Sequence, residues 1–198
     1  ELNKILIPEG KCVWGFANSD AHRVTEIDTA FMDFILPEYS LKNLRYAMEN
    51  GCFFSITRYA KNELGEDFKG EGPVPAVTKL EVNDDEDTIT IGGINCSAIE
   101  WIADGEIIES VTAESDGSLT STINLREHSS KISCYVRAQL KGRGGICMTQ
   151  PFICDDGNLE KLIDETAYPK KLTEEEQRKK KFDDTRIGVI VNKLKDKR

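Results

Sequence analysis

Three apolar runs and one amphipathic segment organise the first third of the chain. The runs are "CVWGFA" at 12–17, "AFMDFIL" at 30–36 and "CFFSI" at 52–56, and each has the length of a buried strand. Between the last two runs, Ser40 is a good N-cap for a helix, and Gly51 stands where helices commonly end. The order strand, loop, strand, helix, strand is typical of a βαβ unit, and it predicts the last part of an α/β domain.

A different pattern follows the stretch at 61–76, which is rich in charge, glycine and proline. Short segments with alternating apolar and polar residues now recur at intervals of about ten residues. Seven of them predict an antiparallel β-sandwich: "VTKLEV", "DTITIG", "SAIEWIA", "EIIESV", "SLTSTINL", "KISCYVRAQL" and "GICMTQPF". The expected turns carry "DDED" at 84–87, Gly92-Gly93, Asp104-Gly105, Asp116-Gly117 and the stretch from Gly142 to Gly145.

The segment at 131–140 divides its side chains between two faces of the predicted sheet. The face expected to meet the core holds Ile132, Cys134, Val136, Ala138 and Leu140. The opposite face holds Ser133, Tyr135, Arg137 and Gln139. Trp101 comes just before an Asp-Gly turn, where an immunoglobulin-like sandwich often places its central tryptophan, so we expect it to anchor the core.

The last forty or so residues are strongly charged. "TEEEQRKKK" at 173–181 has an acidic start and a basic end, which favours a helix because these charges complement its dipole. A solvated or partner-docking tail and a dedicated binding motif both remain open. The predicted fold is therefore α+β and multidomain: an α/β part at 1–69, an immunoglobulin-like sandwich of about seven strands at 70–156, and a charged helical tail at 157–198.

Composition limits the classes of partner. The net charge of −9 over 198 residues would repel phosphate, which argues against non-specific binding to nucleic acid or to an anionic membrane. The six cysteines show no metal-ligand spacing, so we expect reduced thiols and a cytoplasmic location. The first residue is not Met, and the chain starts within an element, which suggests a fragment whose first part is missing.

Asp20 and His22 are the strongest candidates for site chemistry. They lie in "GFANSDAH" at 15–22, directly after the first apolar run. Residues two apart in an extended loop point to the same side, so a carboxylate and an imidazole could reach one Zn²⁺, Mn²⁺ or Fe²⁺ ion. On spacing alone, a surface aspartate beside a histidine is the commoner meaning. The position after a strand of an α/β region favours a site, because sites gather at that end of parallel strands.

"GFANSDAH" resembles the last metal-binding motif of the PHP (polymerase and histidinol phosphatase) family of metal-dependent phosphoesterases. "LKNLRYAMENGCFFSI" is similar to the helix and strand that follow the motif there, and "EWIADGEII" and "YVRAQLKGRGGICMTQPF" resemble the β-sandwich appended to some members. The resemblance covers roughly residues 11–154. It implies a distorted β/α barrel in which two or three metal ions activate water against a phosphoester, with Asp20 and His22 among the metal ligands.

The sequence departs from the family at the rest of the metal site. The expected His-x-His pair, the further histidines and the bridging glutamate are absent, and His128, in a polar turn of the sandwich region, cannot replace them. Two ligands are too few, because a catalytic zinc ion needs about three. Arg58 and Arg137 could each bind phosphate, although an arginine on a strand face is commonly solvated or ion-paired.

Two functions of different classes follow. In the first, the chain is the C-terminal part of a PHP-type phosphoesterase whose metal site is incomplete here, so that this chain alone is inactive and no catalytic residue is assigned to it. In the second, the chain is a non-catalytic β-sandwich module for binding or assembly. We also expect self-association through apolar surface of residues 11–69, notably along "AFMDFIL" and "CFFSI".

Overall fold

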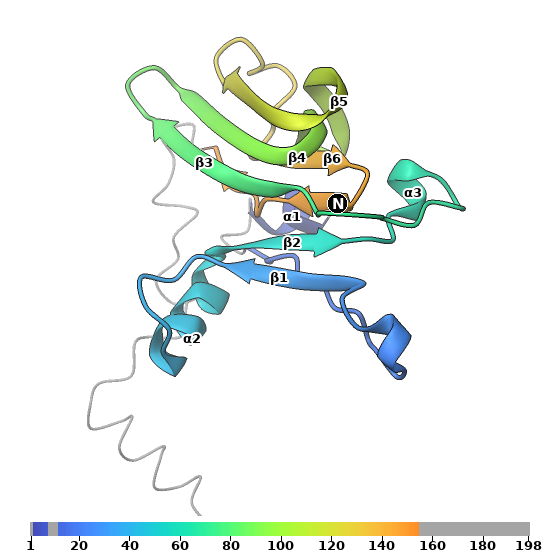
Figure 1. Cartoon of the computed structure of the whole chain (residues 1–198). Helices are drawn as coiled ribbons and strands as arrows, with labels where there is room; N and C mark the ends of the chain where they lie inside the picture. Colours follow the sequence, from blue (N-terminus) through green and yellow to red (C-terminus); the bar gives the residue numbers. More distant parts are fainter. Residues whose placement is uncertain (1, 8–11, 155–198) are drawn as a thin grey trace, which may run out of the picture.

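Strands dominate the computed structural model of this protein, which describes residues 2–7 and 12–154 (Figure 1). In this part of the chain, eight strands form one curled, antiparallel sheet in the order β1-β2-β7-β6-β4-β3, with β5 paired to β4 and β8 to β6. Their bounds are β1 Ala30–Phe34, β2 Phe53–Thr57, β3 Ala76–Asn83, β4 Thr88–Ala103, β5 Glu106–Asn124, β6 Tyr135–Gly142, β7 Gly145–Met148 and β8 Phe152–Ile153. The tail predicted at 157–198 lies outside the described residues.

Helices are short and few among the described residues. They are α1 Leu2–Leu6, the 3₁₀ turn η2 Val24–Glu26, α2 Leu41–Asn50 and α3 Lys61–Leu64. The predicted helix is α2, and both of its predicted ends are confirmed. Ser40 Oγ accepts a hydrogen bond from the Asn43 amide at 3.1 Å, and Gly51 ends the helix in the left-handed region with φ of 68°.

The strands β1 and β2 are antiparallel neighbours, whereas the βαβ pattern predicted parallel ones. Phe34 pairs with Phe53 and Ala30 with Thr57, so α2 is inserted into the connection of a hairpin-like pair. A hydrogen bond of 2.9 Å from the Ile35 amide to the Cys52 carbonyl closes the base of this insertion. For a parallel pair, the chain would have to cross back to the start of β1 before β2 begins. Here α2 leads the chain back to the end of β1, where Phe53 pairs with Phe34.

Two of the predicted turns are bends within long strands. The Gly92-Gly93 pair lies inside β4 and Asp116-Gly117 inside β5, so four predicted segments merge into two strands. The β4–β5 ladder shifts register between Gly93 and Cys96 and again between Cys96 and Ala98. Such bulges bend a strand, and here they let each long strand serve both halves of the curled sheet. The turns at Asp104-Gly105 and at Gly142 to Gly145 are hairpin turns, as predicted.

The core fills the space inside the curl. Trp101 is fully buried, as predicted, and its Nε1 donates a hydrogen bond of 2.8 Å to Ser121 Oγ on β5. The core cluster draws on β2, β4, β5, β6 and β7 and consists of Phe54, Ile56, Ile89, Ile91, Cys96, Ile99, Trp101, Ile123, Val136, Ala138, Leu140 and Cys147. Strands from both sides of the expected boundary at 69 and 70 therefore share one core.

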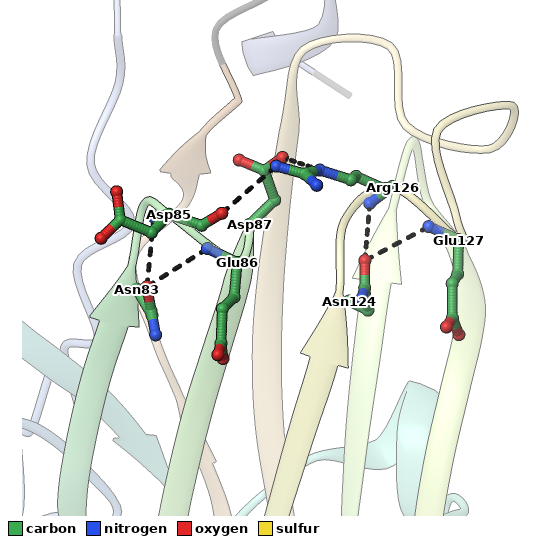
Figure 2. A network of polar contacts seen from close by, with 7 residues as sticks. All are labelled: Asn83, Asp85, Glu86, Asp87, Asn124, Arg126 and Glu127. Atoms are coloured by element: carbon green, nitrogen blue, oxygen red, sulfur yellow. Dashed lines mark hydrogen bonds and ion pairs between the residues drawn. The ribbon is translucent and has the colours of Figure 1, made fainter.

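The turn of the β3–β4 hairpin is joined to the end of β5 by a polar network (Figure 2). Arg126 Nε contacts the Asp87 carboxylate, and Arg126 Nη2 donates to the Asp85 carbonyl at 3.3 Å. On each side, one asparagine turns the chain: Asn83 Oδ1 accepts from the amides of residues 85 and 86, and Asn124 Oδ1 accepts from those of residues 126 and 127. The network is exposed and fixes local turns.

Both faces of β6 are covered, although only one was expected to be. The predicted core face is confirmed at Val136, Ala138 and Leu140, which are fully buried. On the opposite face, Tyr135 and Gln139 are buried as well. This second face lies under the N-terminal segment and α3, so a strand that reads as half-exposed is almost entirely enclosed.

The described residues hold no helix that is both long and apolar enough to cross a membrane. All six cysteines lie in the described ranges and are free thiols.

Candidate functional site

The segment that carries "GFANSDAH" is held against the sheet by side chains, and it is not the strand predicted at 12–17. The Gln150 carboxamide brackets Gly15, accepting from its amide at 2.8 Å and donating to its carbonyl at 2.9 Å. The Asn3 carboxamide brackets Val13 in the same way, at 2.9 and 2.8 Å. Ser55 Oγ also donates to the Gly15 carbonyl. Because these amides are satisfied by side chains, the segment joins no strand ladder.

Aromatic contacts fix the other side of this segment. Trp14 Nε1 donates to the Glu49 carbonyl near the end of α2 at 3.1 Å, and the Trp14 ring lies where a Cβ on Gly51 would have to be, within 2.7 Å. The Phe16 ring packs on Phe53 of β2 with centroids 4.7 Å apart. Residues 13–18 are thereby held between α2, β2 and the end of β7.

The loop that follows presents Asp20 and His22 to solvent. Asp20 has a left-handed φ of 48°, and its amide donates to Asn18 Oδ1 at 3.1 Å. His22 Nδ1 lies 2.7 Å from the backbone carbonyl of Asp20. A carbonyl oxygen only accepts, so Nδ1 carries the proton and a neutral ring keeps its lone pair on Nε2. Metal-binding histidines commonly have this arrangement, because the second nitrogen's hydrogen bond fixes tautomer and orientation.

A further acidic residue of the loop, Glu26, bonds to the backbone. Glu26 Oε2 accepts hydrogen bonds from the amides of His22 at 2.8 Å and Arg23 at 3.0 Å, which closes the turn. In the described part of the chain, no group of three or more histidine, cysteine, aspartate or glutamate side chains could hold a metal ion. The loop therefore presents the Asp20 carboxylate and an oriented His22 ring, but its backbone is left-handed at Asp20 and so is not the extended loop from which a shared side was expected.

A cavity of about 600 Å³ lies between the held segment and the second face of the sheet. Sequence reasoning did not predict it, because the segment that roofs it was expected to be a strand. The wall is partly apolar, with Trp14, Phe16, Tyr135 and Met148, and Asn18 joins it to the Asp20 loop. Arg137 is the one cationic residue among the described residues that line it, and no carboxylate is among them.

Arg137 is positioned by a chain of polar groups centred on the buried Gln139. Its Nη1 donates to Gln139 Oε1 at 3.2 Å, and Gln139 Nε2 donates to Glu100 Oε2 at 2.7 Å and Glu63 Oε2 at 3.3 Å. Both carboxylates in turn pair with Lys141 Nζ, Glu100 at 2.8 Å and Glu63 at 3.4 Å. Burial lowers the pKa of the Arg137 guanidinium, and the nearby Tyr135, Glu63 and Glu100 act in the opposite direction.

The other candidates have structural roles. Arg58 pairs with the Asp28 carboxylate at 3.1 Å and donates to the Gly72 carbonyl at 2.8 Å, so it ties loops together. His128, expected to be solvated, has a side chain only 16% exposed, and its Nε2 lies 2.8 Å from Glu109 Oε2. Among these candidates, Arg137 is the one that lines the cavity, and it forms no ion pair with a described residue.

No protein-family model, curated protein or solved structure matches this chain. The chemistry of the site therefore has to be argued from its own geometry.

Proposed function

We propose that this chain is the C-terminal part of a metal-dependent phosphoesterase of the PHP family. Residues 1–69 would correspond to the end of the catalytic domain and residues 70–156 to the appended immunoglobulin-like sandwich, and in this chain the strands of both parts join one sheet around a shared core. Asp20 and His22 would each give one ligand to the metal site, which is incomplete in this chain. The remaining imidazoles cannot come from this sequence, because its only other histidine, His128, is paired with Glu109.

One observation carries the proposal: the hydrogen bond between His22 Nδ1 and the Asp20 carbonyl. It leaves Nε2 of a neutral ring free to bind a cation, and no described side chain pairs with the Asp20 carboxylate. Glu26 holds the turn that makes this hydrogen bond possible. A surface histidine without a ligand role has no need for a fixed tautomer, so the arrangement favours the metal-site interpretation over a chance pairing.

The donor set suits Zn²⁺, Mn²⁺ or Fe²⁺, which accept imidazole and carboxylate together. Such a cation, when bound, lowers the pKa of a coordinated water from about 15.7 towards 7 and supplies hydroxide at neutral pH for attack on a phosphoester. Two ligands leave most positions of the ion to water. This chain alone is therefore expected to bind metal weakly and to hydrolyse no phosphoester above background.

The test is a Zn²⁺ titration followed by NMR of the two histidine rings. We expect the His22 ring signals to shift with weak affinity and the His128 signals to stay in place, so the two histidines serve as each other's control. Asp20→Ala and His22→Ala should each abolish the response, and His128→Ala should preserve it. Equal shifts at both rings, or none at His22, would contradict the proposal.

Calorimetry of the same titration separates an incomplete site from a complete one. Submicromolar Zn²⁺ binding that disappears in the Asp20→Ala, His22→Ala double variant would mean that this chain forms a full site. The proposal that the site needs ligands from elsewhere would then be wrong. Activity should appear when a polypeptide carrying the missing His-x-His and glutamate is joined to this chain, and His22→Ala should remove it.

A second candidate is a non-catalytic module for assembly, favoured by exposed apolar side chains on the N-terminal part. "CFFSI" does not contribute, because β2 is buried in the sheet. In "AFMDFIL", Ile35 is 52% exposed. Larger exposure lies at the two ends of β1 (Figure 1): Val24 on η2 is 84% exposed, and Tyr39 and Leu41 around the start of α2 are 87% and 81% exposed. Surfaces of this kind are commonly covered by a partner, either the rest of a barrel or a second copy of this chain.

Light scattering over a range of concentrations tests self-association. We expect particles heavier than the 22.2 kDa chain, and we expect Leu41→Asp to return them to that mass. Val82→Asp, at an exposed position on the distant strand β3, is the matched control and should change nothing. A mass of 22.2 kDa at every concentration would exclude self-association.

The setting proposed for this protein is the cytoplasm, with a phosphoester as substrate of the completed enzyme and neither nucleic acid nor membrane as partner. The free thiols support a reducing compartment. The net charge of −9 supports the exclusion of phosphate-rich polymers and anionic lipid surfaces, since it would repel both.

A further inference from the structure

We propose that the cavity beneath residues 13–18 binds a small organic carboxylate, with Arg137 as its anchor and the aromatic wall around its apolar body. This site is separate from Asp20 and His22, which do not line the cavity. Nothing in the proposal requires a metal ion, so it does not depend on the phosphoesterase function.

The charged lining of the cavity favours a ligand of negative charge. Arg137 is the one cationic residue among the described residues that line it, and Glu63, Glu100 and Lys141, which pair with one another, are not among them. Within the described residues, Arg137 itself makes one hydrogen bond, to Gln139, and no ion pair. Arginine carries five N–H donors, more than the hydrogen bond to Gln139 uses. A half-buried cation with unfilled donors favours an anion beside it.

A hydrogen bond to a buried side chain fixes the position of Arg137. Gln139 is 1% exposed, and all three of its hydrogen bonds serve to connect Arg137 to the Glu63, Glu100 and Lys141 group. A flexible surface arginine has no such support. A guanidinium whose plane is held by a buried carboxamide is prepared for bidentate contact with a planar carboxylate.

The apolar side chains that line the cavity favour a ligand with an apolar body. Trp14, Phe16, Met148 and Val13 give the cavity an apolar side, and Trp14 and Phe16 are fixed by their contacts with α2 and Phe53. A volume of about 600 Å³ is typical of small-molecule sites. The polar side chains around Gly15 already have partners, since Gln150 and Ser55 form hydrogen bonds with the Gly15 backbone. Arg137 is thus the charged anchor, and the rest of the lining combines apolar side chains with uncharged polar ones such as Asn18, Thr57 and Thr149.

The experiment uses two probes of nearly equal shape, phenylacetate and its neutral amide, phenylacetamide, added to the whole chain without metal. Binding is followed by NMR at the Met148 methyl group and the Trp14 indole, with the Met48 methyl on the exposed face of α2 as control. We expect phenylacetate to shift Met148 and Trp14 saturably in the millimolar range, and phenylacetamide to bind about tenfold or more weakly.

Two arginine variants complete the design. Arg137→Gln should reduce phenylacetate to the affinity of the amide, and Arg143→Gln, on the exposed β6–β7 turn, should leave both affinities unchanged. Because the comparison of the two probes needs no variant, the proposal stays testable even if Arg137→Gln fails to fold. Three results would overturn it: equal binding of acid and amide, inorganic phosphate binding as tightly as phenylacetate, or no saturable shift at Met148 up to about 50 mM probe.

Discussion

Gln150 holds Gly15 by two hydrogen bonds, to its amide and to its carbonyl, across 135 residues of sequence. The two hydrogen bonds take the place of those that a neighbouring strand would form. They hold residues 13–18, which cover the cavity and lead into the Asp20 loop. Both candidate sites therefore depend on one carboxamide at the end of the sheet. Its removal should affect stability and both sites together.

Gln150→Ala is expected to lower the free energy of unfolding by about 1 to 3 kcal/mol, because the Gly15 amide and carbonyl lose their partner in a partly buried place. Urea denaturation measures the loss, and the Trp14 indole and His22 ring signals should shift in the folded variant. Gln150→Glu is the sharper comparison. It retains the acceptor for the Gly15 amide and puts an oxygen against the Gly15 carbonyl, so it should be no more stable than the alanine variant.

Gly51→Ala should destabilise the protein by about 1 to 3 kcal/mol. Gly51 has a φ of 68°, and an added Cβ would lie 2.7 Å from the Trp14 ring. Gly72→Ala measures the strain of a left-handed φ without a steric clash, because Gly72 has a φ of 86° but open space around it. Gly117→Ala, which has open space and no left-handed φ, should stay within about 0.5 kcal/mol of the parent. If Gly51→Ala cost no more than Gly117→Ala, Trp14 would not be fixed as described.

Trp101→Ala should cost about 3 to 5 kcal/mol, as large deletions in a packed core do. Trp101→Phe keeps most of the volume but leaves Ser121 Oγ without its donor, so it should cost about 1 to 3 kcal/mol. Both values come from urea denaturation. A loss below about 1 kcal/mol for the alanine variant would mean that Trp101 does not anchor the core.

Stability should fall above about pH 9 in part because of Cys147. Burial raises the pKa of this thiol to about 12 from an ordinary value of 9.0, with the nearby Asp33 adding to the rise. Between these values the unfolded chain loses the thiol proton while the folded chain keeps it, so deprotonation stabilises the unfolded state. One such group contributes a slope of up to about 1.4 kcal/mol per pH unit.

The measurement is the free energy of unfolding of the parent and of Cys147→Ala between about pH 8 and pH 10.5. The alanine variant should be less stable at the lower pH, because it leaves a small cavity in the core. Its stability should also decline less steeply as the pH rises. Parallel curves would show that Cys147 does not contribute to the decline.

Local features of the sequence determined local structure. Ser40 and Gly51 set the ends of α2 because capping needs only the helix's own backbone groups and a residue that tolerates a left-handed φ. Asp104-Gly105 set a hairpin turn for the same reason, with φ of 53° and 90° at its two residues. Trp101 could be assigned to the core because a large apolar side chain in an alternating segment has few other places. "GFANSDAH" also led to the prediction of Asp20 and His22 as metal ligands from residue type and close spacing, and this assignment stays a prediction.

The tertiary structure decided everything that depends on a distant partner. The run at 12–17 reads as a strand, yet Asn3 and Gln150 satisfy its backbone and prevent ladder pairing. The direction of β2 beside β1 depends on where α2 returns the chain, which the alternation of residues does not encode. The sequence predicts Arg137 as a solvated residue on a strand. In the structure it lines a cavity, because residues 13–18, more than a hundred residues earlier in the sequence, cover that face of β6. Residue patterns fix which faces are apolar, whereas long-range hydrogen bonds and packing fix what covers them.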